Sequence, residues 1–337
     1  MHPILSFTFS RDATKEIWIY GLNDDDKFEV SGDGDNEIML RLVGGYGDDI
    51  FDISNRKRLK VYDWKHEKAE FTDITPAKQF TPLYETNTFF WRNFRENNNI
   101  LLPNLGFRTD DGLYIGAKDT YTNMGFNGED FRYKHFLSAN YYFDFKAIEL
   151  EYKGTFANII PNWNLEAIGY YTSDKFANNF FGYGNDTEYD EDAVGKDFNR
   201  ARMQQIQLKT GIAFRSINLH AVYENFRVEQ TADRLFTPDN LGETIFDNQN
   251  YVGAEGSLLY ENMDAKDFPT RGLYFQATIG YKKNLKLDNN QFGYGAVKLG
   301  FDRRLISSGD LVLGSKAELR GNFGDDFLFY HAPSIGG

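Results

Sequence analysis

From about residue 99 onward, apolar and polar residues alternate with strict period two in one segment after another. Alternation of this kind is typical of β-strands that have one apolar face and one polar face. A chain with this pattern must fold as a sheet whose two faces meet different surroundings. The clearest segment alternates Leu273, Phe275, Ala277, Ile279 and Tyr281 with Tyr274, Gln276, Thr278 and Gly280.

Eleven segments carry this pattern, and each is long enough to cross a membrane as a tilted strand, which takes roughly 9 to 11 residues. They lie near residues 100–108, 113–123, 134–144, 147–157, 162–172, 202–214, 217–228, 250–262, 272–283, 292–304 and 311–321. Their polar faces carry charges of both signs, namely Glu149, Glu151, Lys153, Glu166, Lys209, Glu255, Lys298, Asp302, Arg304, Lys316, Glu318 and Arg320.

Alternation alone does not decide which face points outward. A lipocalin-like barrel turns its apolar face inward, whereas a membrane barrel turns it outward. The links after the even-numbered segments are mostly short, as at residues 215–216 and 307–310, while those at 174–200 and 230–249 are long. Short turns on one side and long loops on the other are typical of outer-membrane barrels. The sequence therefore predicts an all-β fold with an antiparallel transmembrane β-barrel.

The composition excludes several other classes of protein. Aromatic residues make up 17% of the 337 residues, yet no apolar run approaches the roughly 20 residues of a transmembrane helix. The chain has no Cys, which excludes disulfide frameworks and thiolate sites. The formal net charge of -13 argues against a nucleic-acid partner, because phosphate binding needs a basic surface.

Residues 1–80 have a different pattern, in which short strand-like segments are interrupted by Gly and Asp. Two Gly-x4-Asp-x-Phe segments start at Gly21 and Gly44, an offset of 23 residues that indicates a weak internal repeat. The sequence thus predicts a small β domain at 1–80, a linker at 81–98 and a barrel at 99–337. The strands expected in the small domain are 16–20, 27–30, 37–43, 50–53, 59–64 and 69–72.

Residues 44–52 resemble one unit of the Gly-rich nonapeptide repeat that binds calcium. In that repeat, Gly carbonyls and Asp carboxylates supply hard oxygen ligands. The resemblance implies Ca²⁺ as a cofactor of the 21–52 segment, with Asp26, Asp48, Asp49 and Asp52 as ligands. A single unit does not make a site, and ordinary Asp/Gly turn chemistry explains the same residues. Both interpretations stay open.

No group of residues in the sequence indicates catalysis. The five His residues, at positions 2, 66, 135, 220 and 331, have neither zinc-site spacing nor the arrangement of a catalytic triad. For His220, which lies among the polar residues of a predicted strand, we expect a contact inside the barrel. Glu149 and Glu151 share a face, as in a glycosidase acid/base pair, but a charged barrel lining explains them more simply. We therefore expect no enzymatic activity.

Three motifs occur in order along the barrel region. Phe180-Phe181-Gly182-Tyr183-Gly184-Asn185 lies in the long loop after the fifth segment, and Pro269-Thr270-Arg271-Gly272 precedes the ninth. The third runs from Phe329-Tyr330 to Gly336-Gly337, after the eleventh segment. Together these motifs resemble the bacterial surface antigen superfamily, which contains the BamA-type and TamA-type barrels. The segment before the barrel is similar to that of Bacteroidetes members of this superfamily.

The resemblance implies a sixteen-stranded barrel, truncated here before the tip of its sixth extracellular loop. Eleven is an odd number of strands, and closing the barrel needs more of them, because an open sheet edge in lipid leaves backbone N–H and C=O groups unpaired. The strand number therefore also suggests a truncated chain. The implied location is the bacterial outer membrane, and the implied function is protein insertion or translocation. Outer-membrane lipid and unfolded or exported protein would be the partners.

Two other functions stay open at the level of the sequence. In the first, the barrel anchors or exports a linked calcineurin-like phosphoesterase domain that is not present in this chain. In the second, the chain is a soluble all-β binding protein whose aromatic residues fill an internal core. The residues that precede position 1 would distinguish the first function, and dependence on detergent would distinguish the second.

Overall fold

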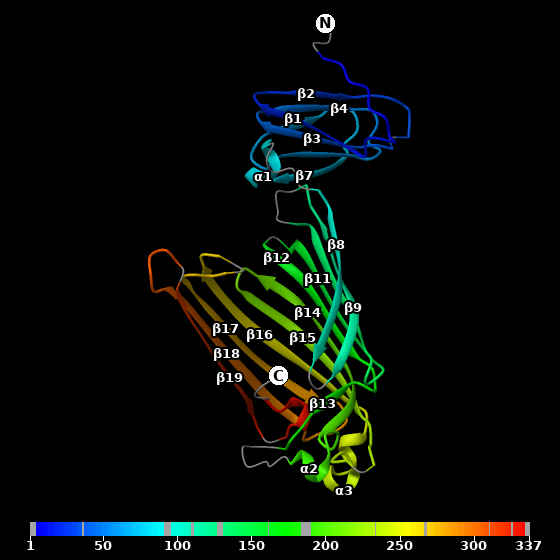
Figure 1. Ribbon diagram of the computed structural model, residues 1–337. Coiled ribbons are helices and arrows are strands. Elements are labelled where there is room, and N and C mark those ends of the chain that lie inside the picture. Colours follow the sequence, from blue (N-terminus) through cyan, green and yellow to red (C-terminus); the bar gives the residue numbers. More distant parts are fainter. Residues whose placement is uncertain are drawn as a thin grey trace. The chain divides into compact units, whose positions relative to one another are not determined.

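The computed structural model describes residues 5–35, 37–90, 96–108, 111–126, 131–160, 162–182, 190–232, 234–265, 268–309, 311–324 and 326–333. The chain divides into two compact units, one of Met1–Glu96 with Met124–Phe131 and one of Asn97–Asn123 with Arg132–Gly337 (Figure 1). Within the described ranges, no helix combines the length and the apolar character needed to span a membrane.

The first unit is a solenoid of parallel strands. One sheet contains β1 (Glu16–Asn23), β3 (Met39–Tyr46), β5 (Leu59–Trp64) and β7 (Ala77–Thr81). The other contains β2 (Lys27–Val30), β4 (Asp49–Ile53) and β6 (Ala69–Phe71). The chain alternates between the two sheets, so that each coil pairs in parallel with the coil before it. The short helix α1 (Tyr84–Asn87) follows β7.

The strand register of the solenoid explains the internal repeat. Glu16 pairs with Met39 and Lys27 pairs with Ile50, which is an offset of 23 residues in both sheets. The core between the sheets contains a stack of Phe rings with centroids 5.0 and 5.3 Å apart. These rings belong to Phe28, Phe51 and Phe71, the first two of which are the Phe residues of the repeated motif.

The second unit is one antiparallel sheet of eleven consecutive strands among the described residues, with each strand paired to the next (Figure 1). The predicted barrel sheet is confirmed, and its strands lie within a few residues of the predicted segments. They are β8 (Asn98–Arg108), β9 (Gly112–Asn123), β10 (Tyr133–Tyr142), β11 (Ala147–Ile160), β12 (Trp163–Thr172), β14 (Arg200–Phe214), β15 (Ile217–Val228), β16 (Gln249–Met263), β17 (Gly272–Asn284), β18 (Gln291–Arg304) and β19 (Val312–Phe323).

Short elements occupy the loops of this unit. The strand β13 (Ala177–Asn179) pairs with the start of β14 and lies off the main path of the sheet. The long loops contain α2 (Glu191–Val194), α3 (Pro238–Leu241) and the 3-10 turn η2 (Glu243–Phe246). A second 3-10 turn, η3 (Phe329–His331), follows β19.

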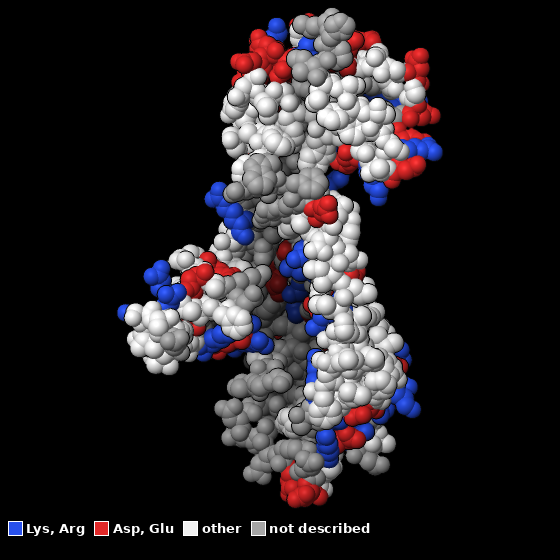
Figure 2. Space-filling model, turned by 45° about the horizontal axis from the view of Figure 1, so that its top comes forward, with Lys and Arg blue, Asp and Glu red and all other residues white. Residues whose placement is uncertain are grey.

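The two faces of the large sheet have opposite exposure. The apolar face is open, with Ile279 67% and Leu319 74% exposed, whereas on the polar face His220 and Glu224 are 7% and 1% exposed. Figure 2 shows charged side chains in the hollow of this unit and a mostly uncharged outer surface. The apolar face therefore points outward, which is the reverse of a lipocalin-like barrel.

Candidate functional site

Polar side chains on the inner face connect strands that are not neighbours in the sheet. Lys209 Nζ on β14 lies 2.9 Å from both carboxylate oxygens of Glu255 on β16. Nε2 of His220 on β15 lies 3.0 Å from Glu166 Oε2 on β12. In each case one strand lies between the partners. Alternate strands are about 9 to 10 Å apart, so these long side chains reach across the strand between them on the polar face.

The lining residues are bonded mainly to one another. Glu149 accepts hydrogen bonds from the hydroxyls of Tyr142 and Tyr170 at 2.8 and 2.9 Å and from the amide of Asn140 at 3.0 Å. Both oxygens of this carboxylate thus accept hydrogen bonds from neutral donors, as expected for a side chain that lines the barrel wall. His220 occupies the inner-face position expected from the sequence.

Aromatic side chains from three distant segments meet at one end of the inner face. The ring of Phe329 in η3 lies 5.0 Å from that of Phe180, which directly follows β13, and 5.5 Å from that of Phe236. Phe236 comes from the loop between β15 and β16 and is 0% exposed. We call this cluster the aromatic plug, and it comprises Phe180, Phe226, Phe236, Tyr251, Phe292 and Phe329.

A buried polar network lies next to the aromatic plug. Nε2 of His331 lies 2.9 Å from Glu224 Oε2, and the other oxygen of Glu224 accepts a hydrogen bond from Lys282 at 2.9 Å. The amide of Asn322 donates to the carbonyl oxygen of His331 at 2.9 Å. Burial lowers the pKa of His331, while the neighbouring Glu224 acts to raise it. The neutral imidazole can donate its Nε2 proton to Glu224 and thereby fasten η3 to the inner wall.

The turn before β17 contains the second sequence motif, and Asp264 organises it. One oxygen of Asp264 accepts the backbone N–H groups of Thr270 and Arg271 at 2.8 and 3.0 Å. The other oxygen accepts a hydrogen bond from Arg304 on β18 at 3.1 Å. These bonds lower the pKa of Asp264, with the Thr270 hydroxyl as the largest contributor. The motif therefore fixes the turn that feeds β17 into the sheet.

The remaining motif residues either set the backbone conformation or lie outside the residues that the structure describes. A Cβ atom on Gly272 would lie 2.2 Å from the carbonyl oxygen of Asn262, so only Gly fits there. Pro269 is half-buried in the same turn. Phe181 is 44% exposed and Gly182 has a φ of 116°, whereas Phe180 is 9% exposed and belongs to the aromatic plug. Gly184, Asn185, Gly336 and Gly337 lie outside the described residues.

The four predicted calcium ligands are divided between two environments in the solenoid. Oδ1 of Asp49 accepts the backbone N–H of Asp26 at 2.9 Å, inside the corner between the sheets. Asp52 instead pairs with Lys27 at 3.3 Å on the surface, and the carboxylate of Asp48 accepts a backbone N–H from the next coil. Within the described ranges, no three His, Asp or Glu side chains are grouped so that they could hold a metal ion.

A third carboxylate, which no pattern in the sequence indicates, shares that corner. Asp63 on β5 is 0% exposed, and burial raises its pKa to about 7. Burial also raises the pKa of Asp49 and of Asp26. The signal for Asp63 was absent from the sequence because its coil lacks the Gly-x4-Asp spacing.

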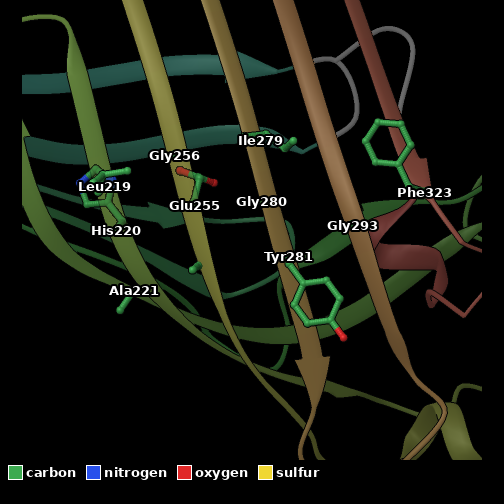
Figure 3. A pocket seen from close by; sticks show the side chains of 11 residues that line it. Leu219, His220, Ala221, Glu255, Gly256, Ile279, Gly280, Tyr281, Gly293 and Phe323 are labelled. Atoms are coloured by element: carbon green, nitrogen blue, oxygen red, sulfur yellow. The ribbon is translucent and has the colours of Figure 1, made fainter.

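One hollow of about 550 Å³ lies over β15 to β19 (Figure 3). Most of its lining belongs to the outward face, where Leu219, Ile279 and Phe323 surround the small residues Gly256 and Gly293. It is therefore a dip in the apolar outer surface, above positions without large side chains. The polar network described above lies on the opposite face of the same strands.

Comparison with known proteins agrees with this architecture. A family model described as the OMP85 superfamily matches residues 169–317, from the second half of β12 to the middle of β19. Among solved structures, the chain is similar to the crystal structure of BamA from Haemophilus ducreyi lacking POTRA domains 1–3. That match has a TM-score of 0.50 and 16% sequence identity, and it covers 72% of this chain.

The chain spans 45% of that BamA chain. No curated protein sequence matches it. The family match lies wholly within the large sheet, and the structural match reproduces an antiparallel barrel sheet of the same kind. Together with the outward apolar face, these matches show that the large sheet is a bacterial outer-membrane β-barrel sheet with the fold seen in BamA, and that its residues 169–317 are similar to the OMP85 superfamily.

Proposed function

We propose that this chain forms part of a barrel that inserts proteins into the outer membrane or translocates them across it. In this proposal the chain performs no covalent chemistry, and its partners are outer-membrane lipid and unfolded or exported protein. The net charge of -13 fits a partner other than nucleic acid. Because the chain spans 45% of the matched BamA chain, the proposal concerns a function shared with residues outside this sequence.

The observation that carries the proposal is the combination of a polar inner wall with the edge strand β8. Among the described residues, β8 pairs with β9 alone. An unpaired strand edge presents backbone N–H and C=O groups that can template an incoming strand. On β8 the side chains of Leu101, Leu105 and Phe107 are 67%, 65% and 72% exposed, which suits contact with lipid and with an amphipathic substrate strand.

Photo-crosslinking in the complete protein tests this use of the β8 edge. A photoreactive amino acid replaces Leu105 on β8 in one variant and Leu208 on β14 in the control. Both Leu side chains lie on the outward face and are 65% and 51% exposed, but β14 is paired on both sides. We expect an arrested outer-membrane β-barrel precursor to crosslink at position 105 and not at 208. Equal crosslinking at both positions, or none at 105, would contradict the proposal.

A further inference from the structure

Three residues stack at equivalent positions in consecutive coils of the solenoid. Val43 pairs with Tyr20 in the coil before and with Tyr62 in the coil after. The next residue in each strand is therefore also stacked, and these residues are Gly21, Gly44 and Asp63. The stack combines two positions without a side chain and one carboxylate, at the inner corner where the two sheets approach each other.

The space left by the two Gly residues contains carboxylate oxygens. A Cβ atom on Gly44 would lie 2.0 Å from Asp49 Oδ2 and 2.8 Å from Asp63 Oδ1. A Cβ atom on Gly21 would lie 2.4 Å from Asp26 Oδ2 and 2.5 Å from the carbonyl oxygen of Gly44. Oxygen atoms from three coils thus line one strip of the interior.

Two of these carboxylates are fully buried and that of Asp26 is partly buried, and none of the three has a compensating charge. Asp49 and Asp63 are both 0% exposed. One oxygen of each, together with Oδ2 of Asp26, is buried and has no hydrogen-bond partner. Among the described residues, no Lys, Arg or His forms an ion pair with any of the three. Burial of an unpaired carboxylate is costly, so such groups normally hold a proton or coordinate a cation.

We propose that this corner of the solenoid is a Ca²⁺ site in which Asp49 and Asp63 are the carboxylate ligands. Asp26 from the preceding coil and the carbonyl oxygen of Gly44, in the same coil as Asp49, would complete it. This ligand set retains two of the residues expected from the sequence, Asp26 and Asp49, and replaces Asp48 and Asp52 with Asp63. The proposal is independent of the function of the barrel.

The donor atoms select among cations. All of them are hard oxygens, which suit Ca²⁺ or Mg²⁺, and no His or Cys nitrogen or sulfur is involved. The carboxylates do not yet converge on a single point, in keeping with the absence of a preformed metal group among the described residues. In this proposal a bound ion draws the free oxygens of Asp49 and Asp63 toward it, while the other oxygen of Asp49 keeps its hydrogen bond to the Asp26 N–H. Ca²⁺ tolerates six to eight ligands in irregular geometry, whereas Mg²⁺ demands a near-ideal octahedron.

The test uses the full chain in detergent, with Ca²⁺ alone as the ligand. Wild-type protein and the variants Asp63→Asn and Asp52→Asn are melted in calcium and in chelator. Asp52 is the matched control, because it is an Asp of the same segment that pairs with Lys27 on the surface. We expect Ca²⁺ to raise the melting temperature of the solenoid in wild type and in Asp52→Asn, and this rise to be lost in Asp63→Asn.

A second measurement on unmodified protein covers the case in which Asp63→Asn does not fold. Tb³⁺ replaces Ca²⁺, and its luminescence is excited through Trp64, the residue next to Asp63. We expect sensitised Tb³⁺ emission that Ca²⁺ reverses and Mg²⁺ does not. Identical melting in calcium and chelator, with no sensitised emission, would mean that the carboxylates hold protons and would overturn the proposal. A rise that persists in Asp63→Asn would also overturn it.

Discussion

At the scale of single residues, the solenoid depends on positions where a side chain is missing. The Gly-x4-Asp spacing places the carboxylate of Asp49 in the space beside its own Gly44. Asp49 cannot easily vacate that space, because its other oxygen holds the backbone N–H of Asp26 in the previous coil. The Gly in this motif therefore serves close packing and is not simply a flexible turn residue.

We predict that Gly44→Ala destabilises the solenoid by about 1 to 3 kcal/mol, the usual cost of forcing an extra methyl group into a packed interior. The control is Gly34→Ala, because nothing lies within 4 Å of a Cβ atom at Gly34. Its effect should stay within about 0.5 kcal/mol, as for most surface substitutions. Hydrogen exchange in β3 and β4 measures both. If the two variants exchange at the same rate, the packing argument fails.

At the scale of elements, the docking of η3 on the inner face depends on a polar network that aromatic side chains surround. The charged groups that face His331 there are Glu224 and Lys282, and the titratable side chains of Tyr251 and Tyr330 contact its ring. Burial disfavours the imidazolium and outweighs the attraction of Glu224, so the pKa of His331 is lowered from its ordinary value of 6.5. His331 therefore binds a proton more readily when η3 is released from the inner face of the sheet than when η3 is docked on it.

The sign of the pH effect on docking follows from that difference. Well above pH 6.5 the imidazole is neutral in both states, so docking has its full stability. As the pH falls below 6.5, the released state is protonated first and docking weakens. We predict that hydrogen exchange of residues 327–333, corrected for its intrinsic pH dependence, accelerates between pH 7.5 and 5.5. The variant His331→Phe should lose this dependence, and a pH effect that persists in it would contradict the assignment.

The strands of the barrel could be predicted from the sequence because alternation with period two identifies both a strand and its apolar face. Two short strands, β7 and β13, were not predicted, since Ala77–Thr81 and Ala177–Asn179 are too short or too polar to show a period. The parallel pairing of the solenoid was also missed, because alternation identifies strands without naming their partners. Only the 23-residue offset indicated the register of its first two coils.

The candidate site was harder to predict because its contacts join strands that are two apart. Glu224 and Lys282 are 58 residues apart in the sequence, and His331 is 107 residues from Glu224. No local spacing connects them. Curvature of the sheet brings them together, and curvature is a property of all the strands. Three motifs indicated the family, but they did not indicate that Phe180 and Phe329 meet in one aromatic plug.

At the scale of the whole sheet, a membrane barrel differs from a soluble one in which face, apolar or polar, points outward. Neighbouring positions Lys298 and Leu299 on β18 point to opposite faces, and β18 is paired with β17 and β19 on its two sides. Leu299 is outward and 47% exposed, whereas Lys298 reaches Glu318 on the inner face at 3.5 Å. The two positions therefore sample lipid and water at the same depth in the membrane.

Because the chain has no Cys, each position can carry a single spin label through Lys298→Cys or Leu299→Cys without further changes. We predict that in liposomes the label at 299 is relaxed mainly by oxygen, which concentrates in hydrocarbon, and the label at 298 mainly by a water-soluble nickel complex. A soluble barrel with an apolar core would shield position 299 and leave position 298 open to both reagents. Reversed or equal accessibilities would contradict the outward apolar face, on which the membrane assignment of the sheet depends.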